Sequence, residues 1–139
     1  MAYRELEGRL TPDQIAAIGH FVERHDGAPG PGGSRITPVV WHIEQCQAIV
    51  QEACGVTCAR AQIVYLYPSA QIVAHVDPPI PGRRYHIPLV VNDGCWVFSD
   101  GTWQQLEVGR VYQMDPTVVH GAVNWGTERR LHLMVDTED

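Results

Sequence analysis

The sequence contains no apolar run that approaches the roughly 18 to 20 residues of a membrane-spanning helix. Its first residues, Met-Ala-Tyr-Arg-Glu, lack the apolar segment of a secretory leader, so we expect a cytoplasmic protein without a membrane partner. An excess of positive charge is missing as well, because the formal net charge is -6 and the pI is near 5.5. Since sequence-independent binding of phosphates needs a basic surface, we expect no nucleic-acid partner.

Cysteines are few, and their spacing offers little to a metal site or a disulfide framework. The four are Cys46, Cys54, Cys58 and Cys95, and in a cytoplasmic chain we expect free thiols. Cys54 and Cys58 could form half of a zinc site, but no second pair at suitable spacing completes it. With 139 residues, 45% of them hydrophobic and 19% charged, the chain can form a core without disulfides. We therefore predict a single domain over residues 1–139.

Residues 1–58 are predicted to form a helical N-terminal part. The run Thr11–Gln14 (TPDQ) has a capping-box pattern with proline at the first helical position, and apolar residues then follow at helical spacing. A second Thr-Pro pair at Thr37 begins another helix in the same way, and Gly55 ends it. The glycine- and proline-rich stretch 27–33 between the two helices is interpreted either as a linker or as a mobile lid.

From residue 60 to residue 136 the pattern changes to short strands separated by turns. Eight segments rich in β-branched and aromatic residues are bounded by Pro, Gly, Asn and Asp. These predicted strands are Ile63–Tyr67, Gln71–Val76, Tyr85–Val91, Cys95–Phe98, Trp103–Leu106, Val111–Met114, Val118–Val123 and Leu131–Val135. Eight short strands with regular turns favour a mainly β fold, a double-stranded β-helix or cupin-like jelly roll, in which the two N-terminal helices would buttress one sheet.

Two histidines and an aspartate in this region are candidate metal ligands. His75 and Asp77 stand two residues apart, on a strand and the loop after it, and His120 follows 43 residues after Asp77. We expect His120 on a strand of the opposite sheet, so that the three meet only on folding. Two imidazoles and one carboxylate can occupy one face of an Fe(II) octahedron and leave the other face open for an organic acid and O₂. The competing interpretation is a surface His-Asp pair and an unrelated core histidine.

Two arginine pairs flank the candidate ligands. Arg130 comes ten residues after the second candidate histidine, so a turn and a return strand would bring its guanidinium beside the metal, where it could bind a carboxylate bidentately. The alternative for Arg130 is an exposed charge on a strand. Arg84 and His86 stand two apart on one predicted strand, so they share a face and line one pocket. Their outer neighbours Arg83 and Arg129 are interpreted as solvated surface.

The order His-x-Asp, His, Arg, with the text RYHIPL from residue 84 and RRLHLMVD from residue 129, resembles the aspartyl/asparaginyl β-hydroxylase branch of the 2-oxoglutarate-dependent oxygenases. The resemblance covers about residues 60–136 and implies Fe(II), 2-oxoglutarate and O₂ as cofactors. It implies Arg84 and His86 as contacts of either the cosubstrate or an anionic group of the substrate. By the same resemblance the metal ligands are His75, Asp77 and His120, and the cofactor-binding residues are Arg84, His86 and Arg130.

One contact of these oxygenases has no obvious counterpart in the sequence. Some relatives help to hold the far carboxylate of 2-oxoglutarate with a hydroxyl residue, and none stands at that place here. Tyr65, Tyr67 or a water is the candidate substitute.

The function that this pattern favours is hydroxylation of an unactivated C–H bond with release of succinate and CO₂. We expect the substrate to be an amino-acid-like small molecule or a peptide, because the chain is too short for an extra domain that would grip a protein. One alternative is a cupin-type isomerase or dioxygenase that does not use 2-oxoglutarate, and another is a non-catalytic metal barrel that binds a small acid. Arg130 discriminates between them, since neither alternative needs a guanidinium opposite the metal. The sequence predicts no oligomeric state.

Overall fold

The computed structural model describes the residues that form two facing β-sheets and one helix. The described residues are 3–25, 34–36, 48, 51–52, 55 and 60–138, and side chains are described for the helix only as far as residue 18. All strand pairs among them are antiparallel, as in the predicted jelly roll. The mainly β class predicted from the sequence is therefore confirmed.

Among the described residues the larger sheet has six strands and the smaller sheet has four. The larger sheet has the order β1 (Arg4–Arg9), β8 (Arg110–Met114), β5 (Arg84–Val90), β10 (Arg130–Asp136), β3 (Arg60–Leu66) and β2 (Ser34–Ile36). The smaller sheet has the order β4 (Gln71–His75), β9 (His120–Asn124), β6 (Cys95–Ser99) and β7 (Thr102–Gln104). The eight strands predicted from residue 60 onward are all present, with ends displaced by no more than three residues.

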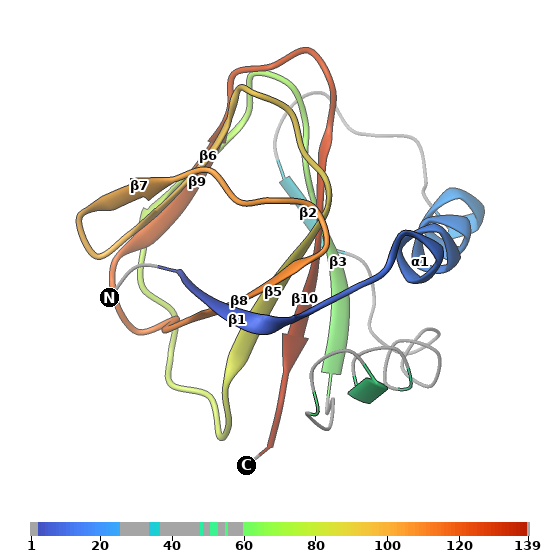
Figure 1. The fold of residues 1–139 in the computed structure, drawn as a ribbon. Helices are drawn as coiled ribbons and strands as arrows, with labels where there is room; N and C mark the ends of the chain where they lie inside the picture. The colour runs from blue at the N-terminus through green and yellow to red at the C-terminus, as the bar shows by residue number, and fades with distance from the viewer. Residues whose placement is uncertain are drawn as a thin grey trace.

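The larger sheet is covered on both faces. Helix α1 (Pro12–His25) lies against one face, on the side away from the smaller sheet (Figure 1). Every residue of β10 is buried, as expected for a strand with both faces covered. Leu131 and Leu133 of β10 pack in a core with Ile18 of α1, whereas Leu66 and Met114 pack against the smaller sheet in a second core. The space between the two sheets is thus filled in part by a second apolar cluster and in part left as the cavity described below.

The helix α1 begins as its sequence predicts. The backbone N–H of Gln14 donates to Thr11 Oγ1 at 3.2 Å, and the N–H of Thr11 donates to Gln14 Oε1 at 2.9 Å, which is the reciprocal capping box. Of the second predicted helix, only three residues between 37 and 53 belong to the described part of the chain, and these are helical: Ala48, Gln51 and Glu52. The stretch 27–33 lies outside the described residues.

The N-terminal part, predicted to be helical over residues 1–58, also contains the strands β1 and β2. In β1 only Leu6 is apolar and partly buried, and the charged side chains around it face solvent. An edge strand of this kind has one neighbour and carries no alternating signal. The strand β2 has three residues, too few for a periodic pattern to be recognised, and it pairs with β3.

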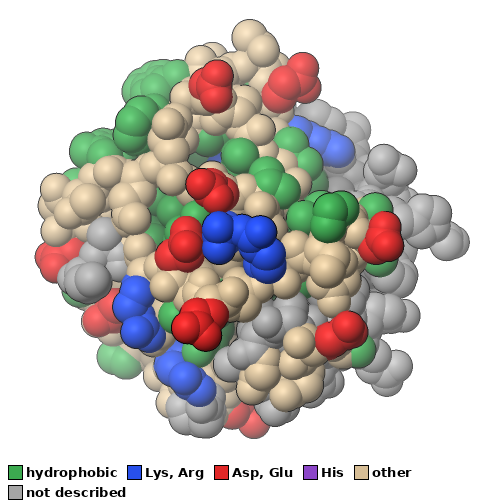
Figure 2. Space-filling model, in the orientation of Figure 1, with side chains coloured by type: hydrophobic (Ala, Val, Ile, Leu, Met, Phe, Trp, Pro, Cys, Tyr) green, Lys and Arg blue, Asp and Glu red, His purple; other side chains and the backbone are tan. Residues whose placement is uncertain are grey.

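On the face seen in Figure 2, basic side chains lie among the acidic ones and form no continuous basic patch. The helices in the described part of the chain include none that is both long and apolar enough to cross a membrane.

Candidate metal centre

The three predicted ligands converge at one end of the smaller sheet. His75 is the last residue of β4, Asp77 lies in the loop after it, and His120 is the first residue of β9. The expectation that His120 comes from the opposite sheet is wrong, because β4 and β9 are neighbours and His75 is paired with His120 in register. Between Ile72 and His75 the strand β4 carries one residue more than β9 does, and this bulge sets the register that brings the two imidazoles together.

The ligand atoms of His75, Asp77 and His120 all lie within 4.8 Å of one another. His75 Nε2 lies 3.5 Å from one carboxylate oxygen of Asp77, and His120 Nε2 lies 3.3 Å from the other. The two imidazole ring centroids are 4.3 Å apart. One ion could therefore contact all three side chains after small adjustments.

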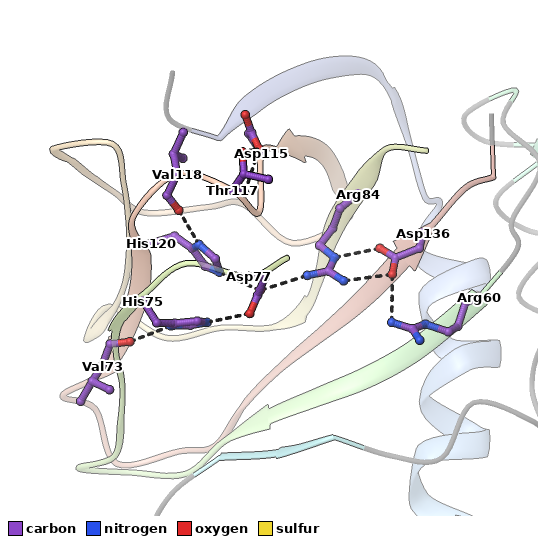
Figure 3. A network of polar contacts seen from close by, with 10 residues as sticks. All are labelled: Arg60, Val73, His75, Asp77, Arg84, Asp115, Thr117, Val118, His120 and Asp136. Carbon is purple, nitrogen blue, oxygen red and sulfur yellow. Dashed lines mark hydrogen bonds and ion pairs between the residues drawn. The ribbon is translucent and has the colours of Figure 1, made fainter. Parts of the chain in front are cut away.

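The backbone fixes which imidazole nitrogen faces the centre. His75 Nδ1 lies 2.8 Å from the carbonyl oxygen of Val73, and His120 Nδ1 lies 2.8 Å from that of Val118 (Figure 3). A carbonyl can only accept, so we assign the imidazole proton to Nδ1 in both rings, which leaves the Nε2 lone pairs directed at the carboxylate. In this tautomer the two lone pairs and the carboxylate together form a donor set for a single divalent cation.

Gly121 permits the close approach of β9 to β4 beside His120. A Cβ atom added at Gly121 would lie 2.6 Å from the carbonyl oxygen of Ile72 and 3.3 Å from the backbone nitrogen of Ala74. Real Cβ atoms essentially never approach other heavy atoms within 3.0 Å, so any side chain here would push the two strands apart. The spacing of the two histidines therefore depends on glycine at this position.

A chain of charged groups supports the carboxylate of Asp77 from the larger sheet (Figure 3). Arg84 donates from Nη1 to Asp77 Oδ2 at 3.3 Å, and it binds Asp136 bidentately from Nε at 2.8 Å and Nη2 at 3.0 Å. Arg60 adds a donor to Asp136 at 3.2 Å. The hydrogen bond that Arg84 donates to Asp136 raises the pKa of Arg84 and outweighs the lowering by burial. Arg84 is thus occupied by two carboxylates of the protein itself.

A cavity of about 530 Å³ opens beside the candidate ligands and lies between the two sheets. The predicted site residues His75, Asp77, Arg84, His86, His120 and Arg130 all line it. Its apolar wall includes Ile72, Ile80, Met114 and Met134. The sequence-based expectation that Arg84 and His86 share a pocket agrees with this arrangement.

Arg130 is a buried cation without a matching anion among the described residues. Only 2% of its surface is exposed, and its Nε has no hydrogen-bond partner within the described part of the chain. Burial lowers the pKa of Arg130 to about 10, so the guanidinium remains charged at neutral pH. A desolvated charge that is unpaired is strongly unfavourable, and buried charges are normally matched by an anion. The arginine therefore fits an anionic ligand in the cavity.

His86 and His132 form a buried pair next to this arginine. Their Nδ1 atoms are 3.1 Å apart, so one ring donates and the other accepts. Burial lowers the pKa of both rings well below 6.5, and the charge of Arg130 acts in the same direction. Both imidazoles are therefore neutral at neutral pH, and His86, which lines the cavity, can offer either a donor or an acceptor to a ligand.

The tyrosines considered as substitutes for the missing hydroxyl do not line the cavity. Tyr65 and Tyr67 belong to the core that packs against α1. The tyrosine that does line it is Tyr3, just before β1. Sequence reasoning missed Tyr3, which stands outside every recognised pattern, and also Asp136, which shares the alternation of Arg130 along β10 and could have been found from it.

The cysteines add no further metal centre within the described part of the chain. Cys54 and Cys58, considered as half of a zinc site, lie outside the described residues, and Cys95 is a buried free thiol. By contrast, the donor set at the centre suits Fe(II), since two neutral imidazoles and one carboxylate leave coordination positions for a chelating acid. The residues present thus fit both a metal ion and a carboxylate ligand.

Comparison with known proteins agrees with this geometry. The pattern of the Aspartyl/Asparaginyl beta-hydroxylase family matches residues 32–139. The fold is similar to the viral collagen prolyl hydroxylase vCPH from Paramecium Bursaria Chlorella virus-1 in its 2OG complex, with a TM-score of 0.71 and 10% identity over 98% of this chain and 95% of that one. It is also similar to a Pseudomonas putida prolyl-4-hydroxylase, with a TM-score of 0.64 and 16% identity over 99% and 93%. An uncharacterized Klebsiella pneumoniae protein with a double-stranded beta-helix domain gives a TM-score of 0.55 and 18% identity over 84% and 86%.

At these identities the solved structures show the fold alone, and that fold is the predicted double-stranded β-helix. The chain covers between 36% and 65% of the length of several other solved proteins that it matches. No curated protein matches it by sequence. The family pattern, however, extends over most of the chain and includes all three candidate ligands and Arg130. On this ground the chain belongs to the aspartyl/asparaginyl β-hydroxylase family.

Proposed function

We propose that the protein is a 2-oxoglutarate- and Fe(II)-dependent dioxygenase that hydroxylates an unactivated C–H bond of an amino-acid-like small molecule or peptide. The observation that carries the proposal is the buried Arg130, whose Nε lacks a partner among the described residues, in the same cavity as the His75-Asp77-His120 cluster. A 2-oxo acid bound to iron would be held by the metal at one end only. The far carboxylate of 2-oxoglutarate would then be bound by the guanidinium of Arg130.

The charged and imidazole side chains of the site would bind the metal and hold its ligands in position. His75, Asp77 and His120 would hold Fe(II) through the two Nε2 atoms and the carboxylate. When bound, iron and 2-oxoglutarate supply the activation of O₂, which places one oxygen atom on the substrate carbon and the other in succinate, with loss of CO₂. Arg84 holds the carboxylate of Asp77 in place through its own bond to Asp136. Such support orients metal ligands and raises metal affinity.

The walls of the cavity would position the organic ligands and exclude water. Arg130 would anchor the far carboxylate of the cosubstrate, and His86 would contact its acid end or an anionic group of the substrate. Three of the five N–H donors of Arg84 bind Asp77 and Asp136, which favours the supporting role described above over a direct contact with the cosubstrate. A cavity of about 530 Å³ is within the usual size of small-molecule sites and leaves room for a small substrate beside the cosubstrate.

The test is binding of the cosubstrate to the metal in the absence of oxygen. Protein loaded with Fe(II) and titrated with 2-oxoglutarate should develop the visible charge-transfer band of a chelated 2-oxo acid. In His120→Ala the band should be absent and the affinity for Fe(II) strongly reduced, because a metal ligand has been removed. Val119→Ala is the matched control, since Val119 is 47% exposed and its side chain is not among those that line the cavity.

A positive result is followed by a screen for the substrate. Free amino acids and short peptides are added aerobically, and succinate release above the uncoupled rate identifies a substrate. A parent protein that binds Fe(II) but gives no band at saturating 2-oxoglutarate would point to one of the alternatives, a metal barrel or a cupin-type enzyme without 2-oxoglutarate.

A further inference from the structure

We propose that the phenol of Tyr3 is the hydroxyl that joins Arg130 in holding the far carboxylate of the dicarboxylate cosubstrate. The inference rests on the proposed function and assigns a contact for which the sequence offered Tyr65, Tyr67 or water. Tyr3 is 7% exposed and lines the cavity together with Arg130.

The main chain of Tyr3 is held in place by the smaller sheet. Its N–H donates to Gln104 Oε1 at 2.9 Å, and Gln104 Nε2 donates back to the carbonyl oxygen of Tyr3 at 3.2 Å. Gln104 ends β7, at one edge of the smaller sheet, whereas Tyr3 leads directly into β1, at one edge of the larger sheet. This reciprocal pair therefore joins the two sheets and fixes where the tyrosine enters the interior.

The side chain of Tyr3 faces the ionisable groups of the cavity. Its ring meets His86 edge-on, with centroids 5.5 Å apart and planes at 83°. Burial raises the pKa of Tyr3 to about 12 although the charges of Arg130 and Arg84 act to lower it, so the phenol keeps its proton at neutral pH. A protonated phenol and a buried guanidinium that line the same cavity supply two donors of the kind that a carboxylate accepts.

Five other buried hydroxyls of the described residues lie away from the cavity, and a sixth, that of Thr137, accepts a hydrogen bond from the N–H of Arg83 at 2.9 Å. Tyr65, Tyr67 and Tyr85 pack in the core on the α1 side of the larger sheet. The hydroxyl of Tyr112 accepts a hydrogen bond from the N–H of Glu107 at 2.9 Å. Ser99 is fully buried on β6 opposite His120. None of the five lines the cavity.

Tyr3 also lies outside the residues that match the family pattern, which begin at residue 32. The contact is therefore a contribution of this chain's own N-terminal segment.

The experiment compares two 2-oxo acids that differ in the far carboxylate. Fe(II)-loaded protein without oxygen is titrated with 2-oxoglutarate and with 2-oxopentanoate, which chelates in the same way and lacks the second carboxylate. Tyr3→Phe keeps the ring and removes the hydroxyl, so its affinity for 2-oxoglutarate should fall roughly 10- to 100-fold, as for loss of a hydrogen bond to a charged group. Its affinities for 2-oxopentanoate and for Fe(II) should stay within about twofold of the parent.

Tyr67→Phe is the matched control, because it removes a buried hydroxyl that faces away from the cavity, and it should bind both acids like the parent. Gln104→Leu tests the same contact without touching the phenol, and it should weaken 2-oxoglutarate binding selectively, though less than Tyr3→Phe does. This second variant keeps the test informative if Tyr3→Phe folds poorly.

The outcomes separate the inference from the proposed function. A parent protein that binds both acids equally would overturn both. If the parent prefers 2-oxoglutarate and Arg130→Met loses that preference while Tyr3→Phe retains it fully, the role of Tyr3 is refuted and the proposed function stands. Loss of preference in Tyr67→Phe with retention in Tyr3→Phe would refute it as well.

Discussion

The two faces of the larger sheet have opposite chemistry although the same strands form both. Along β10, Leu131, Leu133 and Val135 point to α1 and pack in an apolar core. The alternate residues include Arg130 and His132, which point between the sheets and are 2% and 1% exposed. Burial is equally complete on both sides, so burial alone does not distinguish a core from a site.

What distinguishes the faces is whether charged side chains are buried there. The core on the α1 side is built from apolar and tyrosine side chains that pack together. The inner face holds charges and imidazoles, some paired, as Arg84 is with Asp136, and one, Arg130, with an Nε that lacks a partner among the described residues. A hydroxyl without a partner, such as that of Tyr67 on the apolar face, costs far less than a buried charge without a counter-ion, so the unmatched charge of Arg130 marks the face that binds ligands.

The largest effect is expected when the charge of Arg130 is removed from the inner face, which is the face of the larger sheet turned to the smaller sheet. Losing a bidentate contact to a carboxylate costs about 2 to 5 kcal/mol, so Arg130→Met should bind 2-oxoglutarate roughly 30-fold to several-thousand-fold more weakly. Fe(II) binding should persist, because the arginine is not a ligand. Isothermal titration without oxygen measures both affinities. Arg129→Met is the control, since Arg129 lies over the ring of Tyr65 and outside the cavity. A larger loss in Arg129→Met than in Arg130→Met would contradict the assignment.

The complementary change acts on the apolar face of the same strand. Leu133 is fully buried and is paired with Ile63 and Ile87 on the neighbouring strands. Leu133→Ala should lower the free energy of unfolding by about 2 to 5 kcal/mol, because it leaves a cavity in a packed core. The folded fraction should bind Fe(II) and 2-oxoglutarate like the parent. Denaturant unfolding measures the loss, and Leu133→Met, which nearly conserves volume, should cost under about 1.5 kcal/mol.

A smaller effect is expected at Arg84, which links the carboxylate of Asp77 to that of Asp136. Arg84→Met removes the group that bridges Asp136 and Asp77, so the affinity for Fe(II) should fall by roughly 10- to 100-fold. A competition titration with a metal chelator measures it. Arg60→Met is the control, since Arg60 contacts Asp136 but not Asp77. If Arg84→Met kept its affinity for iron and lost only 2-oxoglutarate, Arg84 would be a direct contact of the cosubstrate.

The smallest effect is expected in the pH dependence of stability, through the buried pair His86 and His132. The folded pKa values of His86 and His132 lie well below 6.5, so below about pH 6.5 the unfolded chain binds more protons than the folded one. Stability should therefore be complete above that pH and fall as the pH drops, by about 1.4 kcal/mol per pH unit for each histidine. His132→Phe should show a slope shallower by about that amount between roughly pH 6 and 5 in denaturant unfolding. Identical slopes would show that His132 is not held neutral.

Much of the inner face could be predicted from the sequence because its residues have fixed spacings. The pair His75 and Asp77 and the interval from His120 to Arg130 were sufficient to bring four side chains into one cavity. The sheet that holds His120 was assigned wrongly, because β4 and β9 lie far apart in the sequence and local patterns do not show which distant strands pair. Strand alternation also placed Arg130 inward.

The N-terminal segment was less predictable for a different physical reason. The strand β1 is an edge strand whose side chains are mostly charged, and its position is set by pairing with β8, more than a hundred residues away. Tyr3 reaches the cavity only because of that distant pairing and the bond to Gln104. Local patterns carry no information about such contacts. The role of Arg84 was likewise hidden, since its partner Asp136 lies at the far end of the sequence.

The position of β1 at the edge of the larger sheet has a consequence for any shortened form of the protein. A fragment trimmed to the family-matched residues 32–139 would lack β1 and leave β8 as the new border of the sheet. The strand β8 carries Val111, Tyr112 and Met114, all buried in the intact chain. An uncovered, apolar border with unpaired N–H and C=O groups is a template for strand addition by another molecule. Such a fragment should therefore self-associate more readily than the intact chain, in which β1 covers this border.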